Sequence, residues 1–187
     1  MPMAWTTTGS LTAVPALRHP ELLAAVVAEA LGRLDPAVAE TIGVAQIDPA
    51  LADTAAFCER YGIALDVSAN CVVVKGRRGG DSRFAACMVL ATARADVNGA
   101  VRRRLDVRSA SFAPMDEAVA LTGMEYGGIT PIGLPADWPV LVDAAVASAP
   151  EVVIGGGTRS SKLFLPGSAL LALTRAELLD GLARTAG

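Results

Sequence analysis

The sequence predicts an α+β domain, with a mixed and largely antiparallel β-sheet flanked by helices. Three observations favour this fold class. Apolar residues make up 52% of the 187 residues, which is enough for a substantial core. Segments with helical spacing and segments with strand spacing are interspersed without a regular strand–helix–strand alternation. Two apolar runs, at residues 70–75 and 83–90, flank a glycine-rich polar loop and therefore predict a β-hairpin.

The N-terminal third is predicted to contain two helices and a strand. We expect residues 1–17 to form a loose leader and residues 18–187 to form a single domain. A helix is predicted over residues 20–34, because proline suits its first turn and apolar residues recur at helical spacing. Residues 38–47 are predicted to form a strand. Asp48 and Pro49 then begin a helix that continues to Tyr61 and ends at Gly62.

The remaining elements follow the hairpin. Both hairpin strands are apolar almost throughout, so we expect them to be central and covered on both faces. Asp96 caps a predicted helix over residues 96–105. A short strand is predicted at 109–112 and a helix at 114–121. Further strands are predicted at 140–143, 151–154 and 163–165, with helices at 168–173 and 175–182.

Charge and hydropathy restrict the class of function. The net charge of −3 argues against a protein that coats DNA or RNA by electrostatic attraction. The basic runs at residues 75–78 and 102–104 are either solvated faces or contacts for a short stretch of phosphate backbone. No apolar run approaches the roughly 18–20 residues that span a bilayer, and residues 1–10 lack the features of a signal peptide. We therefore expect a cytoplasmic protein with neither a membrane nor DNA as a partner.

The cysteine and histidine content argues against a metal site. The three cysteines include no CxxC pair, and His19 is the only histidine. A structural zinc ion needs about four close ligands, so we expect neither a metal nor another cofactor. A nucleophile activated by histidine would have to use His19, which precedes a proline. If the protein is an enzyme, its chemistry is expected to work without histidine.

Two glycine-rich segments are the candidate functional loops. Residues 127–133 contain three glycines and a proline, and residues 155–159 contain three consecutive glycines. Such loops leave backbone amides accessible, and these amides can bind an anion or an ester carbonyl as charge develops on its oxygen. An ordinary tight turn is the alternative. Neither segment has the spacing of a phosphate-binding loop or of a dinucleotide-binding fingerprint.

Four segments, in order, resemble a known family. They are NCVVV, LTGMEYGGITPIGLP, LVD and VIGGGTRSSKLFLP, and the likeness extends over about residues 17–182. Together they resemble the YbaK-like aminoacyl-tRNA editing domains, which are related to the insertion domain of bacterial prolyl-tRNA synthetase. The resemblance implies a partly barrel-like mixed sheet and a pocket for the 3′ end of a mischarged aminoacyl-tRNA. It also implies hydrolysis of the aminoacyl ester without a metal, and a tRNA synthetase as a further candidate partner.

The resemblance also implies a set of site residues. Two lysines are candidates for the catalytic cation, because Val73 stands where the family's strand lysine is expected. Lys75 lies two residues along the strand, on the same face and about 6–7 Å away. Lys162 follows the second glycine loop. The substrate-binding candidates are Asn70, Gly127, Gly128, Ile129, Thr130, Pro131, Gly133, Gly155, Gly156, Gly157 and Arg159.

Two functions are therefore expected from the sequence. The first is a trans-acting deacylase that hydrolyses the ester of a small mischarged amino acid on tRNA. An aminoacyl ester is already activated, so positioning and carbonyl polarisation can suffice for this reaction. The second is a binding module with the same pocket but little or no chemistry, for an aminoacyl or nucleotide ligand or a partner protein. Val73 at the lysine position is the feature that favours it.

Overall fold

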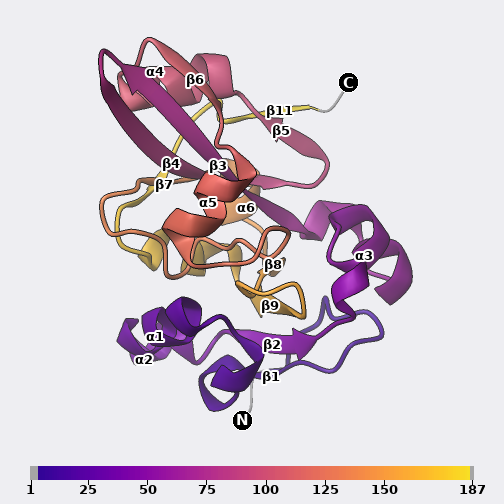
Figure 1. Cartoon of the computed structure of the whole chain (residues 1–187). Helices are drawn as coiled ribbons and strands as arrows, with labels where there is room; N and C mark the ends of the chain where they lie inside the picture. The colour runs from indigo at the N-terminus through magenta and orange to yellow at the C-terminus, as the bar shows by residue number, and fades with distance from the viewer. Residues whose placement is uncertain (1–3, 186–187) are drawn as a thin grey trace.

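Most strands of the computed structural model, which describes residues 4–185, belong to two sheets (Figure 1). The first has the order β1–β2–β9–β8, with β1 at Val14–Pro15, β2 at Gly43–Gln46, β8 at Val152–Gly155 and β9 at Ser161–Leu165. The second has the order β10–β7–β4–β3–β6, with β10 at Ala176–Leu178, β7 at Val140–Val142, β4 at Asp81–Leu90, β3 at Ala69–Arg78 and β6 at Ser109–Phe112. A separate pair joins β5 at Ala93–Ala95 to β11 at Ala183–Thr185.

The predicted fold class is confirmed. Pairing is antiparallel throughout the first sheet, whereas in the second β7 pairs in parallel with both β4 and β10. Within residues 4–185 the sheets stay open and none closes into a barrel. No helix in the same residues is long and apolar enough to cross a membrane.

The β3–β4 hairpin forms as predicted, with its turn at Gly79 and Gly80, and is longer than the apolar runs indicate. Asn70 pairs with Val89, and the register continues to Arg78 opposite Asp81. The expectation that both strands are central also holds for much of their length, because β6 and β7 flank the pair. In Figure 1, β3 begins near α3 and runs to the hairpin turn.

Helices cover the outer faces of these sheets (Figure 1). The α-helices are α1 (Ala25–Arg33), α2 (Pro36–Ala39), α3 (Thr54–Tyr61), α4 (Arg102–Leu105), α5 (Met115–Thr122) and α6 (Ala144–Ala147). Shorter 3₁₀ turns lie at Ala16–Arg18, Pro20–Leu22, Pro49–Leu51, Leu65–Val67 and Gly167–Ala172, and a π-helical turn at Val97–Val101 leads into α4. The predicted caps are present: Gly62 ends α3 with a left-handed backbone, and Asp96 accepts the N–H of Ala100.

Four predicted elements differ from the structure. The helix expected from Asp48 to Tyr61 is divided into a 3₁₀ turn at Pro49–Leu51 and α3, because Asp53 leaves the helical conformation and caps α3. The helix expected over residues 20–34 is interrupted, because Ala24 is extended and donates its N–H to Gly156 O at 3.2 Å. Residues 36–39 form α2 rather than strand, since Asp35 caps a turn begun by Pro36. The helix expected over residues 175–182 is wrong: Arg175 has a φ of 59°, and the chain continues as β10 beside β7.

The segment expected to be a loose leader takes part in the fold from residue 4 onward, while residues 1–3 lie outside the described structure. Val14 and Pro15 form β1 and pair with β2. The indole of Trp5 packs against Gly43, where an added Cβ would lie 2.5 Å from the ring, and donates to Thr41 O at 2.9 Å. The absence of a side chain at Gly43 therefore lets the N-terminal segment cover the sheet.

Aliphatic side chains fill the main core. The largest cluster packs α1 against both sheets through residues such as Val27, Leu31, Ile42, Met88 and Leu163. A second cluster lies between the hairpin and α4. A third contains Phe57 and Phe164, beneath α3. The first and third clusters hold α3 and the β8–β9 loop next to the free end of β3.

Candidate functional site

A cavity of about 470 Å³ lies beside the edge of β3. Strand β6 pairs with β3 only over Val74 to Arg77, so the start of β3 is left as a sheet edge. The N-terminus of α3, the first glycine loop and the end of β8 surround this edge. Five of the predicted site residues line the cavity together: Asn70, Gly127, Ile129, Gly155 and Lys162.

The two glycine loops are joined directly through their backbones. The N–H of Gly157 donates to Gly128 O at 2.8 Å. A Cβ on Gly128 would lie 2.3 Å from Thr158 O, and one on Gly155 would lie 2.5 Å from Gly128 O. Gly128 and Gly155 are therefore needed for close approach of the two chains. Gly127 and Gly157 have φ values of 90° and 86°, so these two positions require glycine for its backbone freedom.

Two backbone donors of the first loop remain available beside the cavity. Gly127 and Ile129 both line it, and within residues 4–185 their N–H groups have no hydrogen-bond acceptor. Gly128, between them, donates to Glu125 O at 2.9 Å. Unpaired amides in a fixed loop can bind an anionic or carbonyl oxygen.

Arg159 fixes the first loop rather than lining the cavity. Its Nη1 donates to Tyr126 O at 3.0 Å and its Nη2 donates to Pro49 O at 3.1 Å. Its backbone N–H donates to a carboxylate oxygen of Glu125 at 2.7 Å. The residue therefore connects the second glycine loop to the segment before α3 and to the first loop.

The other predicted loop residues lie behind the cavity. Gly156 O accepts the N–H of Ala24. Thr130 is fully buried, and its hydroxyl has no hydrogen-bond partner within the described residues. Pro131 and Gly133 face α1, where a Cβ on Gly133 would lie 2.6 Å from Val26 O. These residues support the loop from α1 and do not line the cavity beside β3.

Lys162 is the cation of the cavity. It lies on β9 opposite Gly155 and is only 7% exposed. Its Nζ donates to Ala52 O at 3.4 Å and lies 4.9 Å from the centre of the Phe57 ring. Burial lowers the pKa of Lys162, while Cys58 and Asp53 act in the opposite direction and Arg159 lowers it further. No carboxylate in residues 4–185 forms a salt bridge with it.

The second candidate lysine, Lys75, lies outside the cavity. Its Nζ donates to both carboxylate oxygens of Glu117 on α5, at 2.7 and 2.8 Å. Only 13% of its side chain is exposed, and the ammonium lies 5.7 Å from the Phe84 ring centre. The sequence predicted that Lys75 is either the cation of the site or an exposed residue of the hairpin. The structure instead pairs Lys75 with α5.

Asn70 and Val73 occupy the wall formed by β3. The Asn70 side-chain oxygen accepts the hydroxyl of Thr54 at 2.8 Å, which ties β3 to the start of α3. Val73, at the position where the family lysine is expected, lines the cavity and is 8% exposed. It packs against Ala118 and Trp138. The β3 wall of the cavity is therefore apolar at this point.

Sequence reasoning did not single out several residues that line the cavity. One of them is Asp53, which is the N-cap of α3 and borders the cavity. One of its carboxylate oxygens accepts the N–H groups of Ala55 and Ala56, at 3.1 and 3.2 Å. The only sequence signal for Asp53 is that aspartate is a preferred helix N-cap. At that position its carboxylate faces the positive end of the helix dipole. Phe112 and Tyr126 also border the cavity. Tyr126 lies in the second of the four family-like segments but was not among the candidate residues, and no sequence pattern marked Phe112.

Sulfur and histidine do not form a reactive pair in the cavity. Cys71 lines it, and burial raises the pKa of its thiol. Burial also raises the pKa of Cys87, to about 12. His19 contacts Glu21 at 2.9 Å on the surface. Among the described residues, no three histidine, cysteine or acidic side chains are grouped as a metal site would require.

Comparisons with known proteins identify the family and the fold. The chain matches the model of the aminoacyl-tRNA editing domain over residues 48–173. A solved structure described as a candidate trans-editing enzyme for prolyl tRNA synthetase is similar, with 22% identity and a TM-score of 0.68 over 94% of this chain and 100% of the other. Among curated proteins, none matches the chain.

Two further structures share the fold. One comes from work on epitope backbone grafting by computational design on scaffold proteins, with 23% identity and a TM-score of 0.69 over 88% of this chain and 97% of the other. A second, a hypothetical protein, has 20% identity and a TM-score of 0.61 over 71% and 85%. At these identities the likeness concerns the fold alone. The match to the editing-domain model spans more than half of the 187 residues, and the chain therefore belongs to the family of aminoacyl-tRNA editing domains.

Proposed function

We propose that the protein is a trans-acting aminoacyl-tRNA deacylase that hydrolyses the ester of a small mischarged amino acid. The observation that carries this proposal is the cavity in which Lys162, Asp53 and the free amides of Gly127 and Ile129 meet. Its volume of about 470 Å³ suits a terminal nucleoside with a small aminoacyl group. Membership of the editing family and the likeness to a candidate trans-editing enzyme support the same reaction.

The reaction requires a polarised ester carbonyl and a positioned water molecule. Water attacks the carbonyl carbon, and negative charge develops on the carbonyl oxygen. The bond to the ribose oxygen then breaks, one proton of the attacking water passes to the ribose oxygen, the other is released to solvent, and the amino acid leaves as its carboxylate. The ester is activated already, so no covalent intermediate on the protein is needed.

Each charged group then has a defined role. The amides of Gly127 and Ile129 and the Lys162 ammonium stabilise the carbonyl oxygen as it becomes negative. The Asp53 carboxylate, with one oxygen free of the helix cap, binds the positively charged α-amino group of the substrate. Lys75 does not contribute, because Glu117 neutralises it outside the cavity.

We propose a small amino acid as the substrate, since the cavity of about 470 Å³ suits a small aminoacyl group beside the nucleoside. A binding pocket discriminates between small apolar side chains by only about 1–3 kcal/mol per methylene, so a synthetase needs a separate hydrolytic site for such errors. We propose that the protein acts in the cytoplasm on tRNA released by a synthetase. A synthetase that docks beside it is a further partner in this proposal.

A second candidate function is a binding module that holds an aminoacyl or nucleotide ligand without turnover. Val73 is the observation that favours it, because an apolar side chain lines the cavity at the position of the expected family lysine. In the deacylase, Lys162 supplies the cation from the opposite side. In the binding module, Lys162 only neutralises the bound ligand.

Deacylation of mischarged tRNA tests both functions. Alanyl-tRNA(Pro) and cysteinyl-tRNA(Pro) are the substrates, and correctly charged prolyl-tRNA(Pro) is the control. The wild type is compared with Lys162→Ala and Lys75→Ala. Faster release of alanine or cysteine than in buffer, lost in Lys162→Ala and kept in Lys75→Ala, is the expected result. Rates equal to buffer for every mischarged tRNA, together with thermal stabilisation by the same tRNAs, would establish the binding module instead.

A further inference from the structure

Two aromatic side chains at the cavity are unusually exposed. Phe112 is 66% exposed and Tyr126 is 53% exposed, and both line the cavity. Aromatic residues form only 4% of the chain, and other large rings are packed, such as Phe84 on Trp138 at 5.0 Å between centroids. Exposed apolar residues scattered singly are normal, but two rings at one cavity indicate a contact surface.

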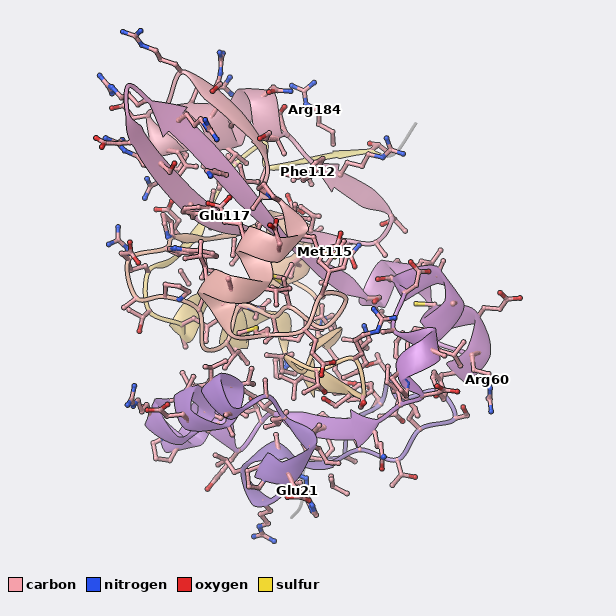
Figure 2. The ribbon with its side chains drawn as sticks, viewed as in Figure 1. Glu21, Arg60, Phe112, Met115, Glu117 and Arg184 are labelled. Atoms are coloured by element: carbon pink, nitrogen blue, oxygen red, sulfur yellow. The ribbon has the colours of Figure 1, made fainter. Side chains whose placement is uncertain are left out.

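Both rings are held on fixed backbone. Phe112 ends β6, opposite Val74 of β3, and the next residue, Ala113, donates its N–H to Val73 O at 2.9 Å. Tyr126 precedes Gly127, and its carbonyl accepts the guanidinium of Arg159. Figure 2 shows Phe112 at the end of β6, with Met115 at the start of α5 beyond it. A rigid ring beside a cavity can stack on a planar ligand at low entropic cost.

Strand β6 leads from Phe112 to an arginine-rich region. The other end of β6 is Ser109, which pairs with Arg77. Ser109 lies three residues before Phe112, about 10 Å along the strand. The arginine surface comprises Arg77, Arg78, Arg83, Arg102, Arg103 and Arg108, all of them exposed. Figure 2 shows nitrogen-tipped side chains gathered around the hairpin turn and α4.

The arginine surface carries a local excess of positive charge. The carboxylate of Asp106 forms an ion pair with Arg78, and its Oδ2 lies 3.8 Å from Nη1 of Arg83. Within residues 4–185, Arg77, Arg102, Arg103 and Arg108 form no salt bridge. This surface therefore stands out from a chain whose net charge is −3. Unpaired guanidinium groups at this density suit a polyanion such as a phosphate backbone.

We propose that the two rings and the arginine surface together bind the 3′ end of the tRNA substrate outside the cavity. Phe112 and Tyr126 stack on the unpaired bases that precede or include the terminal nucleotide, and the arginine surface contacts the phosphates on the 5′ side of these bases. This inference rests on the proposed function, because it takes the tRNA 3′ end as the occupant of the cavity. Aromatic stacking together with arginine–phosphate contacts is the chemistry that single-stranded RNA recognition uses.

The combination of exposed aromatic rings with unpaired arginines favours RNA over an acidic protein partner. An acidic peptide would be attracted by the arginines, but it offers few flat groups for rings that point to solvent. A nucleic acid supplies flat bases and regularly spaced phosphates along one path. Base stacking and phosphate contacts should also respond to different changes in the RNA and in the salt concentration. Stacking should depend on the single-stranded end, whereas phosphate contacts should depend on salt and act on any RNA of similar shape.

Binding of uncharged RNA tests the inference without any hydrolysis. One probe is a fluorescent RNA hairpin that ends in a single-stranded 3′ CCA, and the second is the same hairpin with the single strand removed. Fluorescence anisotropy gives Kd at several salt concentrations for wild type, Phe112→Ala, Tyr126→Ala and the double variant Arg77→Gln, Arg102→Gln. Leu178→Ala, at an exposed apolar position on β10, and Arg60→Gln, on the outer side of α3 in Figure 2, are matched controls.

The inference predicts two separable effects. Phe112→Ala and Tyr126→Ala should each weaken binding of the CCA hairpin by about 5- to 100-fold, and leave binding of the truncated hairpin unchanged. The arginine double variant should weaken binding of both hairpins and reduce the salt slope by about 2. Phe112→Tyr should restore binding, and both controls should behave as wild type.

The outcomes also separate this inference from the proposed function. Equal binding of both hairpins by wild type, or unchanged binding in both aromatic variants, would overturn the inference. An acidic peptide that competes fully at equal charge concentration would also overturn it. If mischarged tRNA is not hydrolysed but the CCA hairpin is still bound through Phe112 and Tyr126, the deacylase proposal fails and the RNA surface remains.

Discussion

Gly157 donates its backbone N–H to the carbonyl oxygen of Gly128, at 2.8 Å. This bond, together with the one from the Glu125 N–H to Gly157 O at 2.9 Å, joins two loops that are about thirty residues apart in the sequence and sets the position of the free amides beside the cavity. Neither loop could come as close with a side chain at Gly128, because its Cβ would meet Thr158 O. The shape of the site therefore depends on backbone contact between the loops.

Gly128→Ala is predicted to destabilise the fold. An added methyl group would overlap backbone atoms, which cannot move aside as a flexible side chain can, so we expect a loss of about 1–3 kcal/mol in the free energy of unfolding. Gly32→Ala is the matched control, since a Cβ there meets nothing within 4 Å and Gly32 lies in α1. It should raise stability by up to about 1 kcal/mol. Urea denaturation measures both, and equal stability of Gly128→Ala and wild type would contradict the close approach.

Lys162→Met is predicted to abolish deacylation and leave the protein folded. Loss of one donor to a developing oxyanion typically costs about 100- to 1,000-fold in rate. A buried ammonium without a carboxylate partner is unfavourable, so the methionine variant should be more stable than wild type, by about 1–2 kcal/mol. Lys75→Met is the control: it should keep activity within about threefold, because its ammonium is paired with Glu117. Activity that survives in Lys162→Met but not in Lys75→Met would reverse the assignment.

The lowered pKa of Lys162 predicts how stability changes with pH. Burial lowers this pKa from the ordinary value of 10.5, so the folded protein binds the proton less firmly than the unfolded chain. Below both pKa values the buried charge is destabilising in full. Between the lowered pKa and 10.5 the unfolded chain binds more protons, and stability therefore rises with pH in that window. The gap in unfolding free energy between Lys162→Met and wild type should narrow as pH rises, and a constant gap would argue against a perturbed lysine.

Asp53→Asn is predicted to weaken substrate binding without harming α3. Asparagine caps helices as well as aspartate does, so the free energy of unfolding should change by less than about 0.5 kcal/mol. Removal of the charge takes away the partner of the substrate's amino group, and KM should rise about 10-fold. Asp48→Asn is the control, since Asp48 caps the neighbouring turn at Ala50 and does not line the cavity. The same KM for Asp53→Asn and wild type would show that this carboxylate does not touch the substrate.

Local patterns allowed much of the fold to be predicted. The β3–β4 hairpin, the cap of α3 at Gly62 and the strands β7, β8 and β9 depend on apolar spacing and turn residues, which act over a few neighbours. Two of the errors occurred where distant segments decide the local structure, whereas α2 forms through the local cap by Asp35. Residues 175–182 have helical composition, yet β10 forms because β7 offers an open edge to pair with. Similarly, α1 starts late because Ala24 bonds to Gly156 of the second loop.

For the site, the sequence alone determined the two glycine loops, the family resemblance and the pair of candidate lysines. Only the tertiary structure distinguished the lysines: Lys162 enters the cavity across from Gly155, whereas Lys75 meets Glu117 of α5. It also brought Asp53, Phe112 and Tyr126 to the same cavity, although no spacing in the sequence connects them. The physical reason is the distance along the sequence over which each kind of interaction acts. Glycine and proline restrict the backbone at their own positions, but the partner of a charge and the exposure of a ring depend on elements that folding brings together.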